Sequence, residues 1–121
     1  METCYESEYL TFKFDSERKI LFTYWTTKEF MKDNEYRAEL ELHEKFIDKY
    51  QPEFHLVNSV NAKYVVPVDT QEWKSAKLAS IYKLFKVKKV AIIMSADFMA
   101  QISNELVVEE VEKRSLKILF F

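Results

Sequence analysis

Two histidines and their acidic neighbours are the residues whose types and spacing most readily suggest catalysis or metal binding. Glu39 and His43 lie four positions apart, which makes them neighbours on a helix, and Glu44 follows directly. A histidine can act as a base near neutral pH. A metal site, however, needs at least three converging ligands, and the sequence shows no second pair of histidine and carboxylate. We therefore expect His43 to be a hydrogen-bonded residue at the edge of the core, and the same interpretation applies to His55.

Polar side chains also follow the apolar segments that are expected to be strands. Ligands tend to bind at the carboxyl edge of a partly parallel sheet, where these side chains should meet. The alternative is that they are ordinary loop and capping residues. The candidate partner or ligand surface comprises Asn58, Ser59, Asn61, Asp69, Trp73 and Ser95.

The lack of glycine weakens several classes of enzyme. The chain has 121 residues and no glycine, whereas phosphate-binding loops, dinucleotide fingerprints and nucleophile elbows need glycine for a positive φ or for close backbone approach. The single cysteine, Cys4, has no helix start or cation near it in the sequence that would activate its thiol. We therefore predict no catalytic residue, no bound metal and no cofactor, and expect a chain that is not an enzyme.

Length and charge limit the remaining classes. With 48% apolar residues, the chain is long enough to bury a core as one domain over residues 1–121. Its 18 basic and 20 acidic side chains give a net charge of −2, which offers no global attraction to nucleic acid. A lone cysteine cannot form an internal disulfide, and the sequence shows no signal peptide and no long uncharged apolar run. We therefore expect a cytoplasmic protein without a membrane span.

The first half of the chain predicts a hairpin followed by a helix. Residues 8–14 and 19–25 alternate between the two faces of a strand, and the polar stretch between them suits a turn. Thr26 and Glu29 have the spacing of a capping box, so a helix should begin there and end at Pro52. Its apolar stripe would consist of Tyr36, Leu40, His43, Ile47 and Tyr50.

The second half predicts alternating strands and helices. Two short apolar segments, 54–57 and 90–94, suit buried strands, and the second is typical of a strand covered on both faces. One helix should begin at Asp69 as its N-cap, and another should cover 97–112, capped by Ser95 and Asp97, with a break near Ser103. The second helix would carry Trp73, Ala76, Leu78, Ile81, Leu84 and Phe85 as its apolar residues.

A last apolar stretch, residues 116–121, completes the order β-β-α-β-α-β-α-β. Strands joined by helices should be parallel neighbours with right-handed crossovers, and the opening hairpin adds an antiparallel part. The predicted fold class is therefore α/β (α+β), a mixed sheet with helices packed on it.

This element order resembles the SpoIIAA-like group, small proteins related to the anti-sigma-factor antagonist (STAS) domain and more distantly to lipid-binding Sec14 domains. The resemblance also rests on residues 69–73 (Asp-Thr-Gln-Glu-Trp), 88–93 and 97–103. It covers nearly the whole chain and includes no catalytic motif. It implies a non-enzymatic regulatory domain that acts by protein–protein binding. Alternatively, through the tie to Sec14, it implies a carrier or sensor of a small apolar or lipid-like ligand, held in a pocket between sheet and helices.

The resemblance also points to one hydroxyl. Antagonist proteins carry a phosphorylated serine or threonine in a loop similar to Asp-Ser-Ser-Gly at the start of the second helix. The matching residues here are Asp69-Thr70-Gln71-Glu72, so Thr70 is the candidate phospho-switch, and the glycine is missing. The alternative is that Asp69 or Thr70 only caps the helix.

Members of the group usually end with a further helix after the last strand, whereas this sequence ends at Phe121. Part of one sheet face or an apolar edge would then lack its usual cover. We expect a second subunit to provide that cover, which makes a homodimer the predicted assembly.

Overall fold

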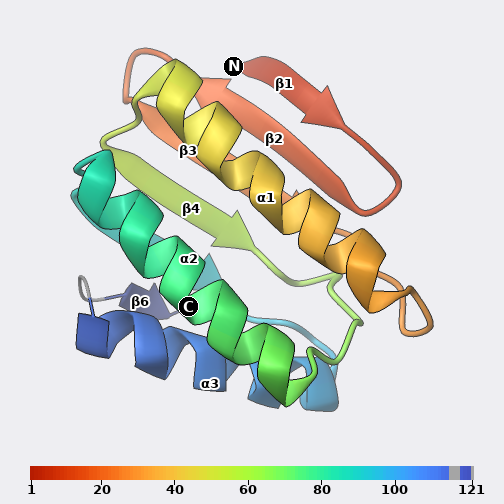
Figure 1. Ribbon diagram of the computed structural model, residues 1–121. Helices are drawn as coiled ribbons and strands as arrows, with labels where there is room; N and C mark the ends of the chain where they lie inside the picture. Colours follow the sequence, from red (N-terminus) through yellow and green to blue (C-terminus); the bar gives the residue numbers. More distant parts are fainter. Residues whose placement is uncertain (115–117, 121) are drawn as a thin grey trace.

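The computed structural model describes residues 1–114 and 118–120. The strands form one mixed sheet whose spatial order is the order of the chain, from β1 to β6 (Figure 1). The predicted α/β class is confirmed at this level. In chain order the elements are β1 (Glu2–Glu6), β2 (Leu10–Asp15), β3 (Ile20–Trp25), α1 (Asp33–Tyr50), β4 (Phe54–Asn58), α2 (Val68–Leu84), β5 (Lys89–Ile93), α3 (Phe98–Arg114) and β6 (Ile118–Phe120).

The sheet is antiparallel at its amino-terminal side and parallel at the other. β1, β2 and β3 pair as antiparallel neighbours, and β3 to β6 pair in parallel across the connections that contain the helices. The predicted hairpin is thus confirmed as β2 and β3. The Asp15 carboxylate holds its turn by accepting hydrogen bonds from the N–H groups of Glu17 and Arg18, at 3.1 and 3.2 Å.

The predicted element order lacked the first strand. β1 pairs with β2 through a register shift between Thr3 and Tyr5. This edge strand has a glutamate at each end and little alternation of apolar and polar positions, so the sequence pattern does not reveal it. The observed order is therefore β-β-β-α-β-α-β-α-β.

The described helices all lie on the same face of the sheet. Side chains from α1, α2 and α3 line one cavity together with side chains from β3, β4 and β5, and Figure 1 shows α1 and α2 in front of the strands. Right-handed crossovers that advance in one direction along a sheet give this arrangement. The expectation that β5 is covered on both faces is wrong for the described chain, because Ala91 and Ile93 lie on the face without helices.

Helix α1 begins at Asp33 rather than at the capping box predicted at Thr26. The Thr26 hydroxyl instead donates a hydrogen bond to the Glu8 carbonyl at 2.8 Å. The Thr27 hydroxyl accepts from two N–H groups of the loop after β4. Both threonines therefore fasten loops, and the helix starts after them. The predicted apolar stripe is confirmed except at its end, where Tyr50 is only partly buried, and the prediction lacked Phe46. The buried residues of α1 are Tyr36, Leu40, His43, Phe46 and Ile47.

The buried face of α2 differs from the predicted one. Ala76 is exposed and Leu84 is 64% exposed, although both were expected on the apolar face. Leu78 and Ile81 are buried as predicted, but polar residues share the buried face with them, so the spacing of apolar residues alone does not locate it. The prediction that Asp69 is the N-cap is wrong, because Pro67 holds that position and Asp69 lies in the first turn. The buried residues of α2 are Thr70, Lys74, Ser75, Leu78, Ala79, Ile81 and Tyr82.

Helix α3 runs without a break past Ser103, contrary to the prediction. The Ser103 hydroxyl donates to the Ala100 carbonyl at 2.9 Å and accepts from the Val66 N–H at 3.2 Å, so the buried serine is satisfied within a continuous helix. The predicted cap is confirmed for Asp97, whose carboxylate accepts from the Ala100 N–H at 2.9 Å. The Ser95 hydroxyl accepts instead from the Asp97 N–H at 3.1 Å, just before the helix.

Of the last predicted strand, residues 118–120 form β6, and residues 116, 117 and 121 lie outside the described part of the chain. Within that part, no helix combines the length and the apolar character needed to cross a membrane.

Candidate functional site

A small cavity lies between the sheet and the helices. Its volume is about 40 Å³, and a neighbouring cavity of about 10 Å³ shares Trp25 and Lys74 with it. A water molecule needs roughly 10–15 Å³ on this measure, so the larger cavity has room for a ligand of only a few non-hydrogen atoms. Most of its wall is apolar. Its polar lining residues are His43, His55, Ser59, Lys74 and Tyr82.

Lys74 lines both cavities and carries a primary amine. Helix α2 buries this residue to 8% exposure. Its Nζ donates a hydrogen bond to the Tyr36 hydroxyl and lies 5.5 and 5.1 Å from the ring centres of Trp25 and Tyr36. Among residues 1–114 and 118–120, no carboxylate lies within ion-pair distance of this amine. In the described part of the chain, the amine of this buried lysine thus has a phenol hydroxyl and two aromatic rings beside it, and no carboxylate.

Burial determines the charge of this amine. The interior disfavours the ammonium form and lowers the pKa of Lys74 to about 7. At neutral pH the charged and neutral forms are therefore similarly populated. Such a group can take up a proton when an anion arrives beside it.

A chain of buried hydrogen bonds runs along the same cavity. His43 Nδ1 lies 2.9 Å from the Leu40 carbonyl, which can only accept, so this nitrogen carries the hydrogen. Neutral His43 then accepts at Nε2 from the Thr23 hydroxyl at 3.3 Å. Thr23 in turn accepts from His55 Nε2 at 2.7 Å, and His55 Nδ1 accepts from the Tyr82 hydroxyl at 2.9 Å. Every member of the chain is satisfied, and all the bonds run in one direction.

Both imidazoles in this chain are neutral. Burial lowers the pKa of His55 to about 3. Burial also lowers the pKa of His43 well below its usual value, and the nearby His55 and Lys74 lower it further. The prediction that both histidines are hydrogen-bonded core residues is confirmed for their burial and contacts.

The polar residues predicted at the carboxyl edge of the sheet meet only in part. The Ser59 N–H donates to the Ile93 carbonyl at 2.9 Å, and the Ser95 hydroxyl donates to the Ala62 carbonyl at 2.6 Å. These bonds join the loops that follow β4 and β5. Ser59 is buried against the cavity, whereas Asn61 is exposed.

The remaining predicted residues lie apart from these two serines. The Asn58 carboxamide oxygen accepts from the Val60 N–H at 3.1 Å and closes the turn after β4. Trp73 is half-buried on α2, and its ring centre lies 5.0 Å from the Arg37 guanidinium and 5.8 Å from Lys77 Nζ. The predicted residues therefore do not form one surface in this structure. Asn58, Ser59 and Ser95 make contacts within and between loops, whereas Trp73 lies beside the cations of Arg37 and Lys77.

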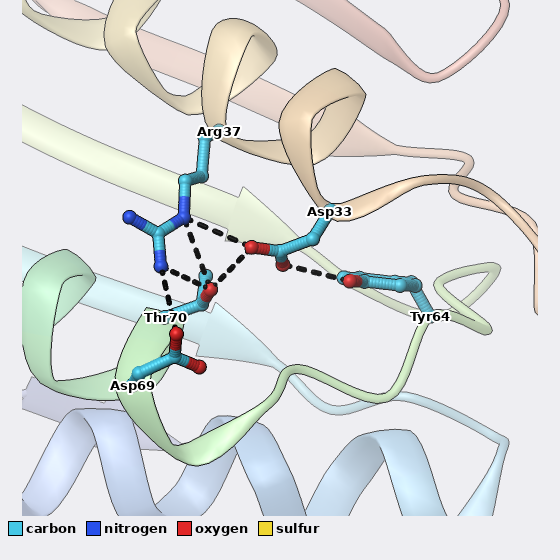
Figure 2. A network of polar contacts seen from close by, with 5 residues as sticks. All are labelled: Asp33, Arg37, Tyr64, Asp69 and Thr70. Carbon is cyan, nitrogen blue, oxygen red and sulfur yellow. Dashed lines mark hydrogen bonds and ion pairs between the residues drawn. The ribbon is translucent and has the colours of Figure 1, made fainter.

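Thr70 lies at the centre of a polar cluster at the beginning of α1 and α2, which Figure 2 shows. Its hydroxyl donates to Asp33 Oδ2 at 2.5 Å and accepts from Arg37 Nε and Nη2 at 3.1 and 2.7 Å. Arg37 also forms ion pairs with Asp33 at 2.9 Å and with Asp69 at 3.5 Å. The Tyr64 hydroxyl donates to the other Asp33 oxygen at 2.7 Å. The cluster joins α1, α2 and the loop before α2.

The position of Thr70 bears on the proposed switch. The residue is fully buried, and its hydroxyl both donates and accepts, so a kinase would have to meet it in an opened state. Burial raises the pKa of Asp33, but the hydrogen bonds from Thr70, Tyr64 and Arg37 lower it more, and the net pKa lies below its usual value. Asp33 is therefore charged at neutral pH and holds Thr70 in place.

Replacing Thr70 with valine is expected to destabilise the protein by about 1–3 kcal/mol, because Asp33 and Arg37 then lose a buried hydrogen-bond partner. Thr70→Ser keeps the hydroxyl and should cost clearly less. Urea unfolding of both variants measures the difference. A loss in Thr70→Val no larger than that in Thr70→Ser, which removes only the methyl group, would contradict the role of the hydroxyl.

The sequence pattern did not identify the groups around the cavity that matter most. Lys74 lies four residues after Thr70 and four before Leu78, which is the spacing of one helix face. That spacing places Lys74 on the same helix face as Thr70 and Leu78 and could have indicated its burial, but a lysine is expected at the surface. Thr23 sits between two histidines from other elements, and no local pattern marks such a contact.

The structure gives no support for a metal centre, and the comparisons give no relative. Residues 1–114 and 118–120 contain no group of three or more histidine, cysteine, aspartate or glutamate side chains that could hold a metal ion. No family model, no curated protein and no solved structure matches the chain. The function is therefore inferred from the geometry of the site itself.

Proposed function

We propose that this chain is a non-enzymatic binding module that takes a small carboxylate into the cavity beneath α2. The observation that carries the proposal is the Lys74 amine, buried beside the cavity with no carboxylate within ion-pair distance in the described chain. An uncompensated buried ammonium destabilises a protein, and a bound anion would remove that cost. The carboxylate would pair with Lys74, and its short apolar body would contact the aliphatic wall.

The size of the cavity limits the ligand. About 40 Å³ is far below the roughly 150 Å³ of an apolar cavity that binds benzene. A lipid chain, which the resemblance to Sec14 implies, does not fit this volume. Acetate and propionate are the ligands of suitable size and charge, and no chemical step on them is proposed.

Calorimetric titration with propionate tests the proposal. We expect a dissociation constant of about 0.1–1 mM, since a ligand of five non-hydrogen atoms supports only modest affinity. The affinity should fall about tenfold for each pH unit above pH 7, because Lys74 must first gain a proton. Propanamide, which has the same shape and no charge, should not bind.

A matched pair of variants controls this titration. Lys74→Met should abolish propionate binding, whereas Lys83→Met, at an exposed position of the same helix, should leave it unchanged. Equal binding by propanamide, binding by the Lys74→Met variant, or no binding at 50 mM propionate (roughly 50 times the weakest expected constant) would each refute the proposal.

Regulation by protein–protein binding, which the resemblance to the SpoIIAA-like group implies, is the second candidate function. The observation that favours it is the cluster of Arg37, Asp69 and Thr70, at the place where that group carries its phosphorylated residue. A phosphate on Thr70 would sit beside Arg37, but it would also repel Asp33 and Asp69. Finding that phosphate in protein isolated from cells would support this candidate. Membership of the group and a cytoplasmic location stay predictions from the sequence.

A further inference from the structure

One face of the sheet carries no helix of the described chain, yet it is largely apolar. Burial alternates strictly along β3, where Leu21, Thr23 and Trp25 are buried beneath the helices and the residues between them are partly exposed. Phe22 and Tyr24 stack on each other at 6.3 Å between ring centres, which places them on that open side. The open face therefore continues across the sheet through the alternate residues of β2, β4 and β5.

The strand register arranges this open face in three rows. Each row contains one residue from each of β2, β3, β4 and β5, in that order across the sheet. The first row is Asp15, Ile20, Phe54 and Lys89; the second is Lys13, Phe22, Leu56 and Ala91; the third is Thr11, Tyr24, Asn58 and Ile93.

We propose that a second copy of this chain covers the open face, related to the first by a two-fold axis that runs parallel to the strands between β3 and β4. This interface is independent of the proposed carboxylate site, which lies on the other side of the sheet. Such an axis places each row opposite the same row of the partner, with the order of the strands reversed. Each β2 then lies over the partner's β5, and each β3 lies over the partner's β4. Aligned packing of two sheets about 10 Å apart is the usual geometry of such a contact.

The charges of the first row favour this axis. Asp15 of each copy comes to lie opposite Lys89 of the other, so the dimer contains two equivalent pairs of opposite charge. Between these pairs, Ile20 lies opposite Phe54, and both are apolar. A two-fold axis perpendicular to the strands would instead place Asp15 against Thr11 and Lys89 against Ile93, so neither charge would face an opposite charge of the other copy.

The other two rows bring no like charges together under the same axis. In the second row Phe22 lies opposite Leu56. The long Lys13 side chain, whose amine lies 5.4 Å from the Tyr24 ring centre, lies opposite Ala91, which has the smallest side chain of the face. In the third row the Tyr24 hydroxyl comes within reach of the Asn58 carboxamide.

Sedimentation of the full chain over a range of concentrations tests the interface. We expect a dimer at about 100 µM. Leu56→Arg, which places a charge at the apolar centre, should weaken the dimer more than 100-fold, and circular dichroism checks that this variant folds. Lys89→Glu, at an exposed position that should tolerate it, should weaken the dimer about tenfold because Asp15 of the partner then faces a carboxylate.

Charge exchange tests the register itself. Combining Asp15→Lys with Lys89→Glu should restore dimerisation above the level of either single variant. Because Asp15 also holds the β2–β3 turn, circular dichroism first checks that both variants carrying Asp15→Lys fold. Lys83→Glu, the same charge change on the helical side, should leave the dimer unchanged. A monomer at several hundred micromolar, or a dimer insensitive to Leu56→Arg, would overturn the interface and assign the face to another occupant. If the parent protein forms a dimer but the folded double variant dimerises no more tightly than the single variants, the two-fold arrangement would be overturned.

Discussion

Replacing Lys74 with methionine is expected to make the protein more stable at pH 7 and to remove a rise of stability with pH. Unfolded lysine titrates near 10.5, whereas burial lowers the pKa of Lys74 to about 7 in the folded protein. Between these values the unfolded chain holds a proton that the folded chain lacks, so folding stability rises with pH by up to about 1.4 kcal/mol per unit. Methionine keeps the apolar stem and loses the charge. We expect a gain on the order of 2 kcal/mol at pH 7.

Urea unfolding at pH 7, 8 and 9 measures this effect. The range stops below pH 10, because burial raises the pKa of Tyr36 and Tyr82 and their titration reverses the trend there. Lys83→Met on the exposed side of the same helix serves as the control and should keep the slope of the parent protein. If the parent protein shows no slope between pH 7 and 9, Lys74 is not buried as described, and the carboxylate site loses its basis.

Mild acid is expected to destabilise the protein through His43 and His55. Both pKa values are lowered by burial, that of His55 to about 3. As the pH falls below 6.5, the unfolded chain binds two protons that the folded chain does not, and the folded state loses stability at up to about 2.7 kcal/mol per pH unit. At pH 5 His55 alone accounts for a loss of about 2 kcal/mol and His43 adds to it, against a total stability that is usually 5–15 kcal/mol.

Denaturant unfolding at pH 7, 6 and 5 gives this slope, and NMR of the imidazole protons assigns it. In the folded protein neither ring should titrate between pH 7.5 and 5.5. The nitrogen shifts should show a hydrogen on Nδ1 of His43 and on Nε2 of His55, as the chain through Thr23 requires. A native imidazole that titrates near pH 6.5 would contradict the buried chain.

Patterns that lie within one element predicted much of the fold. The hairpin of β2 and β3 and the buried stripe of α1 follow from alternation and helical spacing, because each has one apolar and one polar side. The predictions were wrong where side chains have partners elsewhere in the chain. Thr26 looked like a helix cap, but its hydroxyl is bonded to the Glu8 carbonyl.

The candidate site was harder to predict for the same reason. The interior face of α2 carries Thr70 and Lys74, and no apolar periodicity marks polar residues that are buried. Thr70 was singled out by a resemblance, but its partners Asp33 and Arg37 lie on another helix. Such polar contacts depend on how elements pack together, which a single sequence encodes only indirectly.

The sequential order of the strands has a consequence for how the chain folds as it is synthesised. From β2 onward, every strand pairs with the strand that precedes it in the chain. The sheet can therefore grow from one edge as the polypeptide leaves the ribosome, and no strand waits for a segment that has not yet been made. Each crossover helix then becomes available to cover the helical side of the growing sheet before the next strand arrives.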